Sequence, residues 1–162
     1  MALLHSVRGG QRRGLRRVLT AAAIVALGAC QADVPLELQP DSILRVSLGL
    51  SERDVVHRVS VLARGTAEVA VPAQTTLGVG AWVQFQGGDE RGHVVRFDTL
   101  TLADSARTWL RETEQVQSPP LLTSSSRWVV SFEGAPTGLY PFVVIGTGET
   151  GEGWIDVAVE GR

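Results

Sequence analysis

Residues 79–85 read VGAWVQF, and apolar side chains recur at every second position of this stretch. Val79, Ala81, Val83 and Phe85 form one series, whereas Trp82 falls in the other. Successive side chains of a β-strand point to opposite faces of its sheet. The spacing therefore predicts a strand whose apolar series faces a core and whose Trp82 faces solvent.

The same alternation recurs in seven further short runs along the chain. Turn-forming residues separate the runs, among them Arg64-Gly65, QGGD at 86–89 and Gly134-Ala135-Pro136. Short alternating runs bounded by such turns are typical of an antiparallel β-sandwich or small barrel, so the sequence predicts an all-β protein. In the run 67–71 the apolar series is Ala67, Val69 and Val71. The eight predicted strands are 44–50, 55–63, 67–71, 79–85, 93–97, 128–132, 140–144 and 155–159.

Residues 102–113 break the alternation. Apolar residues from Leu102 to Leu110 recur at helical spacing, and Thr101 stands where an N-cap is expected. We expect one helix of about three turns in this long connection, ending before the sequence SPP at 118–120.

The first 29 residues have the organisation of an export signal. A cationic segment, RRGLRR at 12–17, precedes a largely apolar segment of twelve residues at 18–29, which is too short to span a bilayer. The sequence LGAC at 27–30 resembles the box of bacterial lipoproteins, in which the cysteine is lipidated and becomes the new N-terminus. Cys30 is the only cysteine of the chain. The resemblance implies a signal peptide over 1–29, a lipid-anchored tether over 30–41 and a folded domain over 42–162.

Charge and cysteine content exclude some classes of protein. After the signal, ten arginines are outnumbered by seventeen acidic residues, which gives a net charge of −7. Nucleic-acid binding requires clustered cations that displace the counterions of phosphates, so we expect no nucleic-acid partner. A single cysteine also excludes an internal disulfide.

Five segments of the predicted domain occur in a recognisable order. VGAWVQF at 79–85 is followed by GHVVRFD at 92–98, then by SRWVVSF at 126–132, GLYPFVV at 138–144 and GEGWIDV at 151–157. Their order and spacing resemble those of the cupredoxins, the small blue-copper proteins that include plastocyanin, azurin and amicyanin. The resemblance covers residues 42–160 and implies a cupredoxin-like antiparallel Greek-key β-sandwich.

The copper ligands of that family are mostly missing. A type 1 copper site needs two imidazoles and a thiolate, usually with a weak axial ligand. By the resemblance, His93 stands at the first histidine position, Val144 at the cysteine, Thr147 at the second histidine and Thr150 at the axial methionine. We therefore expect no metal and no cofactor, and His93 is the only matching ligand position.

No other pattern indicates an enzyme. His57 shares its strand face with valines and is expected to be a hydrogen-bonded residue of the core or its rim. His93 could pair with Asp89 or Asp98, but histidine, serine and aspartate occur together in most domains by chance. We therefore expect no catalytic residues.

The glycine-rich sequence GTGETG at 146–151 takes the place of the family's ligand loop and is the leading candidate for a binding surface. The sequence thus predicts a lipid-anchored, extracytoplasmic module on the periplasmic face of the outer or inner membrane, with a protein partner in a membrane or envelope complex. An Ig-like or carbohydrate-binding envelope domain, with Trp82 as its platform, is the alternative. The candidate interaction residues are His93, Thr147, Glu149, Thr150 and Trp82.

Overall fold

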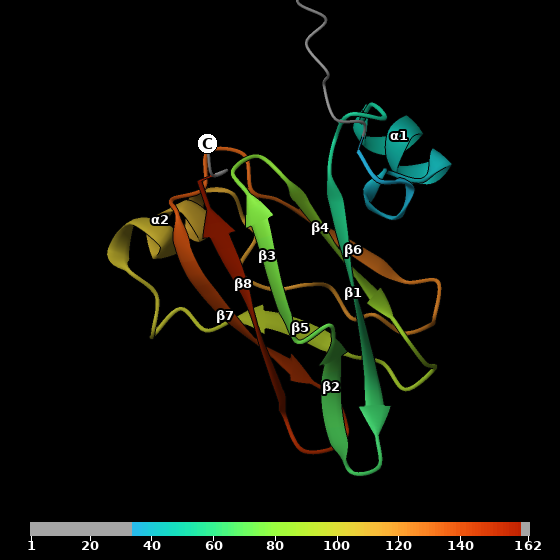
Figure 1. Cartoon of the computed structure of the whole chain (residues 1–162). Helices are drawn as coiled ribbons and strands as arrows, with labels where there is room; N and C mark the ends of the chain where they lie inside the picture. Colours follow the sequence, from blue (N-terminus) through green and yellow to red (C-terminus); the bar gives the residue numbers. More distant parts are fainter. Residues whose placement is uncertain (1–33, 160–162) are drawn as a thin grey trace, which may run out of the picture. The chain divides into compact units, whose positions relative to one another are not determined.

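Two four-stranded β-sheets face each other in the computed structural model, which describes residues 34–159. One sheet has the strand order β2-β1-β4-β6 and the other the order β3-β8-β7-β5 (Figure 1). The strands are β1 (Val56–Arg64), β2 (Ala67–Val71), β3 (Gln74–Gly78), β4 (Trp82–Gly87), β5 (Val94–Phe97), β6 (Arg127–Ser131), β7 (Gly138–Ile145) and β8 (Gly151–Ala158). A 3-10 turn, η1 (Leu36–Leu38), and two helices, α1 (Ser42–Leu48) and α2 (Asp104–Glu112), complete the described elements.

The core lies between the inner faces of the two sheets. Phe85 of β4 meets Phe142 of β7 edge to face, with ring centroids 5.1 Å apart, the geometry that aromatic quadrupoles favour. Tyr140 and Val144 of β7 are also fully buried, which confirms the predicted inner face of that strand. The main cluster of buried residues includes members from Val59 to Val157, so both sheets contribute to one hydrophobic core.

Each sheet contains one parallel pair of strands. β1 pairs in parallel with β4, and β3 pairs in parallel with β8, while the other four pairings are antiparallel. Parallel neighbours need a crossover between them. Here the chain makes it by leaving the first sheet after β2, adding β3 to the second sheet and returning as β4. Alternation within a strand carries no information on the direction of its neighbour, so the sequence could not reveal these pairs.

The strand predicted for 44–50 is wrong, because this segment contains helix α1. The Asp41 side chain accepts hydrogen bonds from the backbone N–H groups of Ile43 and Leu44, both at 3.0 Å, and so caps the helix. Gly49, with φ of 69°, ends the helix in the left-handed conformation that glycine adopts without strain. Leu44 is buried while Val46 is exposed, so the residues at every second position do not share one environment.

Strand β2 forms as predicted but with its faces exchanged. Glu68 and Ala70 are buried, whereas Ala67 and Val69 are half-buried and Val71 is exposed. A strand has a period of two, so a change of one position moves every side chain to the opposite face. Strand β3 escaped prediction because only Thr75 and Leu77 of its five residues are buried, which leaves little apolar alternation.

The predicted helix in the long connection is confirmed as α2. Its N-cap position is Ala103 rather than Thr101, and the Thr101 hydroxyl is engaged with Asp98 instead. The Trp109 ring of α2 stacks on Phe132 at 5.5 Å, which fixes the helix on the end of the core. Among the described residues no helix has the length and apolarity to cross a membrane. The predicted signal and Cys30 lie outside the described residues.

Candidate functional site

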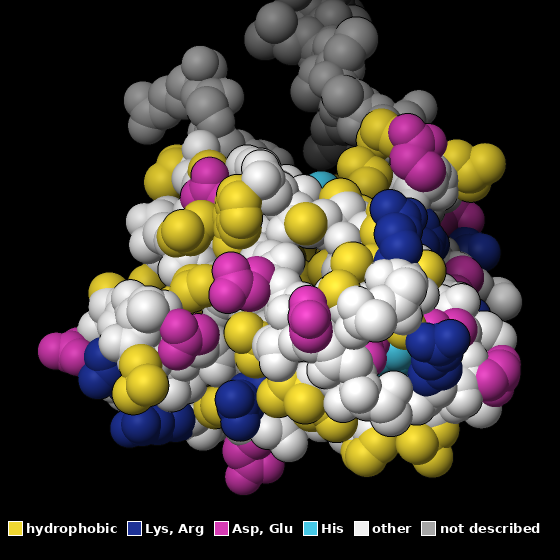
Figure 2. All heavy atoms as spheres, turned by 90° about the horizontal axis from the view of Figure 1, so that it is seen from below, with side chains coloured by type: hydrophobic (Ala, Val, Ile, Leu, Met, Phe, Trp, Pro, Cys, Tyr) yellow, Lys and Arg dark blue, Asp and Glu magenta, His cyan; other side chains and the backbone are white. Residues whose placement is uncertain are grey.

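Three connections meet at the end of the sandwich where β1, β4 and β7 finish. They are the β1–β2 turn, the β4–β5 loop and the glycine-rich β7–β8 loop, which the register brings together through pairs such as Ala67 with Glu149. Figure 2 views the domain from this side and shows acidic and basic side chains mixed with apolar ones. This face therefore has no broad patch of one charge that would select a strongly charged partner.

A buried imidazole lies between two carboxylates at this end. The His93 Nε2 atom is 2.7 Å from the Asp89 Oδ1 atom, and its Nδ1 atom is 2.8 Å from the Glu68 Oε2 atom. The side chains of His93 and Glu68 have no exposed surface, whereas that of Asp89 is 26 % exposed. Of the two possible partners, Asp89 and Asp98, the structure places Asp89 against the His93 ring.

His93 contacts both carboxylates through its ring nitrogens. Each of the two ring nitrogens of His93 has a carboxylate oxygen within 2.8 Å. The contact with Glu68 is close, but its angle is not that of a regular hydrogen bond, so its attraction is mainly electrostatic. A buried carboxylate is costly unless it is paired. His93 provides that pairing for Glu68.

Asp89 is held ionised by its hydrogen bonds. Burial by itself would raise the pKa of this carboxyl group, but the backbone N–H groups of Ala63 and Arg91 and the His93 ring outweigh that effect and lower the pKa to about 2. The bond from Ala63 measures 2.8 Å and ties the β4–β5 loop to the end of β1.

Glu68 also supports the glycine-rich loop from beneath. Its Oε1 atom accepts a hydrogen bond of 3.1 Å from the backbone N–H of Gly148. Its own backbone N–H donates to the carbonyl of Glu149 at 2.8 Å. A Cβ atom at Gly146 would collide with the Glu68 carboxylate, and one at Gly151 would collide with the Glu68 carbonyl. The glycines therefore allow the loop to lie directly against β2.

The predicted interaction residues do not all lie on one surface. Thr147, Glu149 and Thr150 are exposed on the glycine-rich loop. His93 is only 1 % exposed, so its assignment to an interaction surface is wrong, because its ring is enclosed by Glu68 and Asp89.

Trp82 lies near the opposite end of the sandwich. It begins β4, where it pairs with Val56 at the start of β1, and its side chain is half-buried rather than free in solvent. None of the large apolar residues exposed between positions 34 and 159 is aromatic. The structure therefore offers little support for a flat aromatic platform that would bind carbohydrate.

The residues of this end do not fit a type 1 copper site. Both nitrogens of His93 face carboxylates, and these approach from opposite sides of the ring, so the three groups cannot converge on one ion. Val144, at the cysteine position, is a fully buried core residue paired with Val95. Thr147 and Thr150 supply neither an imidazole nor a thioether. In the described part of the chain, no three or more His, Cys, Asp or Glu side chains are placed to hold a metal ion.

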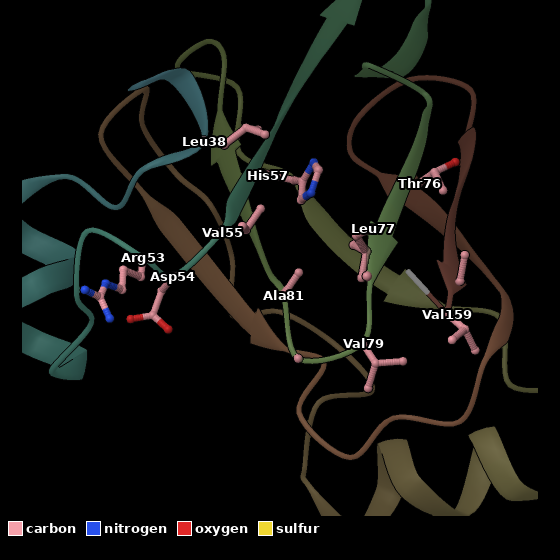
Figure 3. Close-up of a pocket in the computed structure, with 13 residues that line it drawn as sticks. Leu38, Arg53, Asp54, Val55, His57, Thr76, Leu77, Val79, Ala81 and Val159 are labelled. Carbon is pink, nitrogen blue, oxygen red and sulfur yellow. The ribbon is translucent and has the colours of Figure 1, made fainter. Parts of the chain in front are cut away.

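His57 lines a separate cavity of about 560 Å³ at the α1 end of the domain. Its ring extends from β1 toward Leu77 of β3 (Figure 3). Burial lowers the pKa of this histidine, which favours the neutral ring. The interpretation of His57 as a residue of the core rim agrees with this position. The two described histidines, His57 and His93, therefore lie at opposite ends of the domain.

Sequence reasoning missed Glu68, the central residue of the cluster. The alternation in 67–71 assigned it to solvent because its neighbours Ala67 and Val69 are apolar. The density of glycines at 146–153 was the available signal, since it indicates that a bulky or charged group approaches the loop backbone closely. Nothing in the sequence shows that this group comes from a residue almost eighty positions earlier.

No family model and no curated protein matches the chain. It is similar in structure to a purple cupredoxin from Nitrosopumilus maritimus, with a TM-score of 0.41, 17 % identity and coverage of 63 % of this chain and 99 % of the other. A mutant fern plastocyanin is similar with a TM-score of 0.46 and 16 % identity, over 62 % of this chain and 99 % of the other. Auracyanin A from Chloroflexus aurantiacus is similar with a TM-score of 0.43 and 14 % identity, over 65 % of this chain and 99 % of the other. Identities this low concern the fold alone. The two four-stranded sheets by themselves establish an all-β sandwich.

Proposed function

We propose that this protein is a lipid-anchored, extracytoplasmic cupredoxin-like module that carries no type 1 copper and binds a protein partner at the membrane surface. Cys30 is the proposed site of lipidation, and the glycine-rich loop is the proposed contact surface. The protein has no proposed catalytic role.

The observation that carries this proposal is the closed environment of His93. A copper ligand must offer a free nitrogen lone pair, and both ring nitrogens of His93 face carboxylates within 2.8 Å. The cluster that these residues form has a structural consequence instead, since the same Glu68 supports the glycine-rich loop. This end of the fold is therefore better suited to presenting a loop than to holding a metal.

The loop has the properties of a preorganised binding surface. Thr147, Glu149 and Thr150 are exposed, while the backbone beneath them is fixed by hydrogen bonds from Gly148 to Glu68 and from Glu149 to Thr66. A loop that is already rigid loses less conformational entropy when it binds. Binding residues on such scaffolds commonly lie on loops of this kind.

Photo-crosslinking in cells tests the proposed contact surface. A photoreactive amino acid in place of Thr147 should give one major protein adduct, and the added substitution Glu149→Arg should lower its yield. The same photoreactive residue in place of Leu100, which is 89 % exposed on the β5–α2 connection, is the matched control. An adduct pattern common to both positions, or no protein adduct from position 147, would contradict the proposal.

A further inference from the structure

The end of the domain at which the described chain begins carries many exposed apolar side chains. Ten large apolar residues are exposed among residues 34–159, and six of them lie on η1, α1, the β3–β4 turn and the residue that follows β8. Val46 is 87 % exposed. Contiguous apolar surface on a soluble domain usually marks a contact with a protein or a membrane. We call this set the apolar end: Leu36, Ile43, Val46, Leu48, Val79 and Val159.

Three of these segments, η1, the β3–β4 turn and the end of β8, border one cavity. Leu38 of η1, Val79 of the β3–β4 turn and Val159 all line the cavity that contains His57 (Figure 3). Figure 1 shows α1 and the end of β8 on the same side of the sandwich, away from the β1–β2 turn. The apolar end is thus opposite the glycine-rich loop.

Polar contacts hold the N-terminal segment in place. The Arg58 guanidinium of β1 donates to the carbonyl groups of Glu37, within η1, and of Gln39, the residue that follows it. Arg127 of β6 forms an ion pair with Asp41, the residue that caps α1. Arg58 and Arg127 both belong to the first sheet, so they hold α1 in a fixed orientation on that sheet. The exposed apolar side chains of α1 therefore cannot rotate toward the core. They remain available for a contact outside the domain.

The short chain between Cys30 and Val34 limits how far the domain can lie from a membrane in which Cys30 is anchored. Cys30 precedes Val34 by four residues, which can span at most about 14 Å. The headgroup layer of a bilayer accounts for about 5–7 Å of that length. If Cys30 carries the lipid, the end of the domain that follows the tether must stay close to the headgroups.

We infer that the apolar end rests on the surface of the bilayer in which Cys30 is anchored, with Ile43 and Val46, which share one face of α1, in the interfacial region. The inference rests on the proposed lipid anchor. It adds a fixed orientation to the proposed function, because contact at this end directs the glycine-rich loop away from the membrane.

The contact has apolar rather than electrostatic chemistry. Arg45 of α1 is paired with Glu52 at 2.6 Å, and Arg127 is paired with Asp41, so these cations are already neutralised. Attraction to anionic lipid is screened by salt, whereas insertion of apolar side chains is not. Zwitterionic phosphatidylcholine is therefore a sufficient surface, and the contact should persist at high salt.

Chemical coupling tests the contact without relying on cellular lipidation. Since Cys30 is the only cysteine, the chain from residue 30 onward can be joined through it to a maleimide phospholipid in phosphatidylcholine vesicles. In Val46→Trp the emission of the added tryptophan should be quenched by brominated phosphatidylcholine. Leu122→Trp is the matched control, because Leu122 is 62 % exposed and follows Leu121, which pairs with His93 at the opposite end. Its added emission should not be quenched.

Hydrogen exchange of the α1 amides provides a second measurement. Coupling should slow their exchange, and the double substitution Ile43→Glu/Val46→Glu should abolish that slowing without unfolding the domain, since both side chains are exposed. Equal quenching at positions 46 and 122, or unchanged exchange on coupling, would overturn the inference. Protection of α1 in a dimer of the uncoupled chain would overturn it as well, by assigning the face to a second copy.

The anchor itself is tested separately. Labelled palmitate should enter the native protein in cells and should not enter Cys30→Ala. Loss of this result would contradict the proposed anchor while leaving the coupled-vesicle result to stand as a property of the domain.

Discussion

Glu68 shows how a single buried charge shapes the functional end of this sandwich. Its side chain has no exposed surface, yet its carboxylate contacts two groups. These are the ring of His93, the residue before β5, and the backbone N–H of Gly148 in the glycine-rich loop. An apolar residue at this position would remove the acceptor of the Gly148 N–H and the carboxylate beside His93 Nδ1. Asp89 completes the cluster at the other ring nitrogen, Nε2.

The substitution Glu68→Gln should lower the free energy of unfolding by about 3–5 kcal/mol, the range for breaking a buried ion pair by removing one charge. The amide keeps the shape of the side chain but leaves His93 without one of its two carboxylates. Glu149→Gln, on the exposed surface of the same loop, should change stability by less than about 0.5 kcal/mol. Denaturant unfolding measures both, and equal values would show that the buried pair contributes nothing to stability.

The pH dependence of stability should report Asp89. The pKa of this group falls from 3.8 to about 2 on folding, so the unfolded chain binds its proton more readily. The stabilisation is therefore complete above about pH 4 and is lost as the pH falls toward 2. Asp89→Asn should remove this part of the acid dependence, as measured by thermal melts between pH 2 and 5. A variant with the same acid profile as the native chain would contradict the assignment.

At the scale of elements, strands with alternating valine and aromatic residues were predicted correctly, and segments with mixed signals were not. β7 has Tyr140, Phe142 and Val144 in one buried series, so periodicity and tertiary structure agree. In α1 the same period of two was misleading, because the capping side chain of Asp41 and the Gly49 stop decide the helix. Local hydrogen bonds outweighed the apolar pattern there.

Phe142→Ala should cost about 3–5 kcal/mol of unfolding free energy, because the ring is buried between Phe85 and Phe97 and its removal leaves a cavity. Leu139→Ala on the same strand should cost little, since Leu139 is 54 % exposed. Denaturant midpoints measured side by side provide the comparison. Similar midpoints for the two variants would mean that the inner face of β7 is assigned incorrectly.

At the scale of the whole molecule, the two ends of the sandwich have different chemistry. One end has a buried charged cluster beneath an exposed glycine-rich loop, and the other has exposed apolar side chains around a cavity. An arrangement of this kind can face two different surroundings at once. The proposed orientation, with a partner at one end and the bilayer at the other, follows from this polarity.

Copper should leave the protein unaffected. The chain from residue 30 onward, carrying Cys30→Ala to remove its terminal thiol, should stay colourless with Cu(II), because intense colour requires a thiolate ligand and His93 has no free nitrogen. Its melting temperature should not rise, since a ligand stabilises only the state that binds it. Plastocyanin treated in parallel is the positive control. A blue protein, or a rise of many degrees with one equivalent of copper, would contradict the proposal.

The amino-acid sequence by itself determined the all-β class, helix α2, the inner face of β7, the burial of Ala81, Val83 and Phe85 but not of Val79, and the expectation that His93 lacks the other copper ligands. These features depend on residue type and local spacing, which a sequence states directly. The parallel pairs β1–β4 and β3–β8, the burial of Glu68 and the separation of Trp82 from the glycine-rich loop were decided only by the tertiary structure. The physical reason is that each depends on which distant segment lies opposite. The partner of the Glu68 carboxylate, His93, is set by how β2 and the β4–β5 loop pack, and not by the residues beside it in the chain.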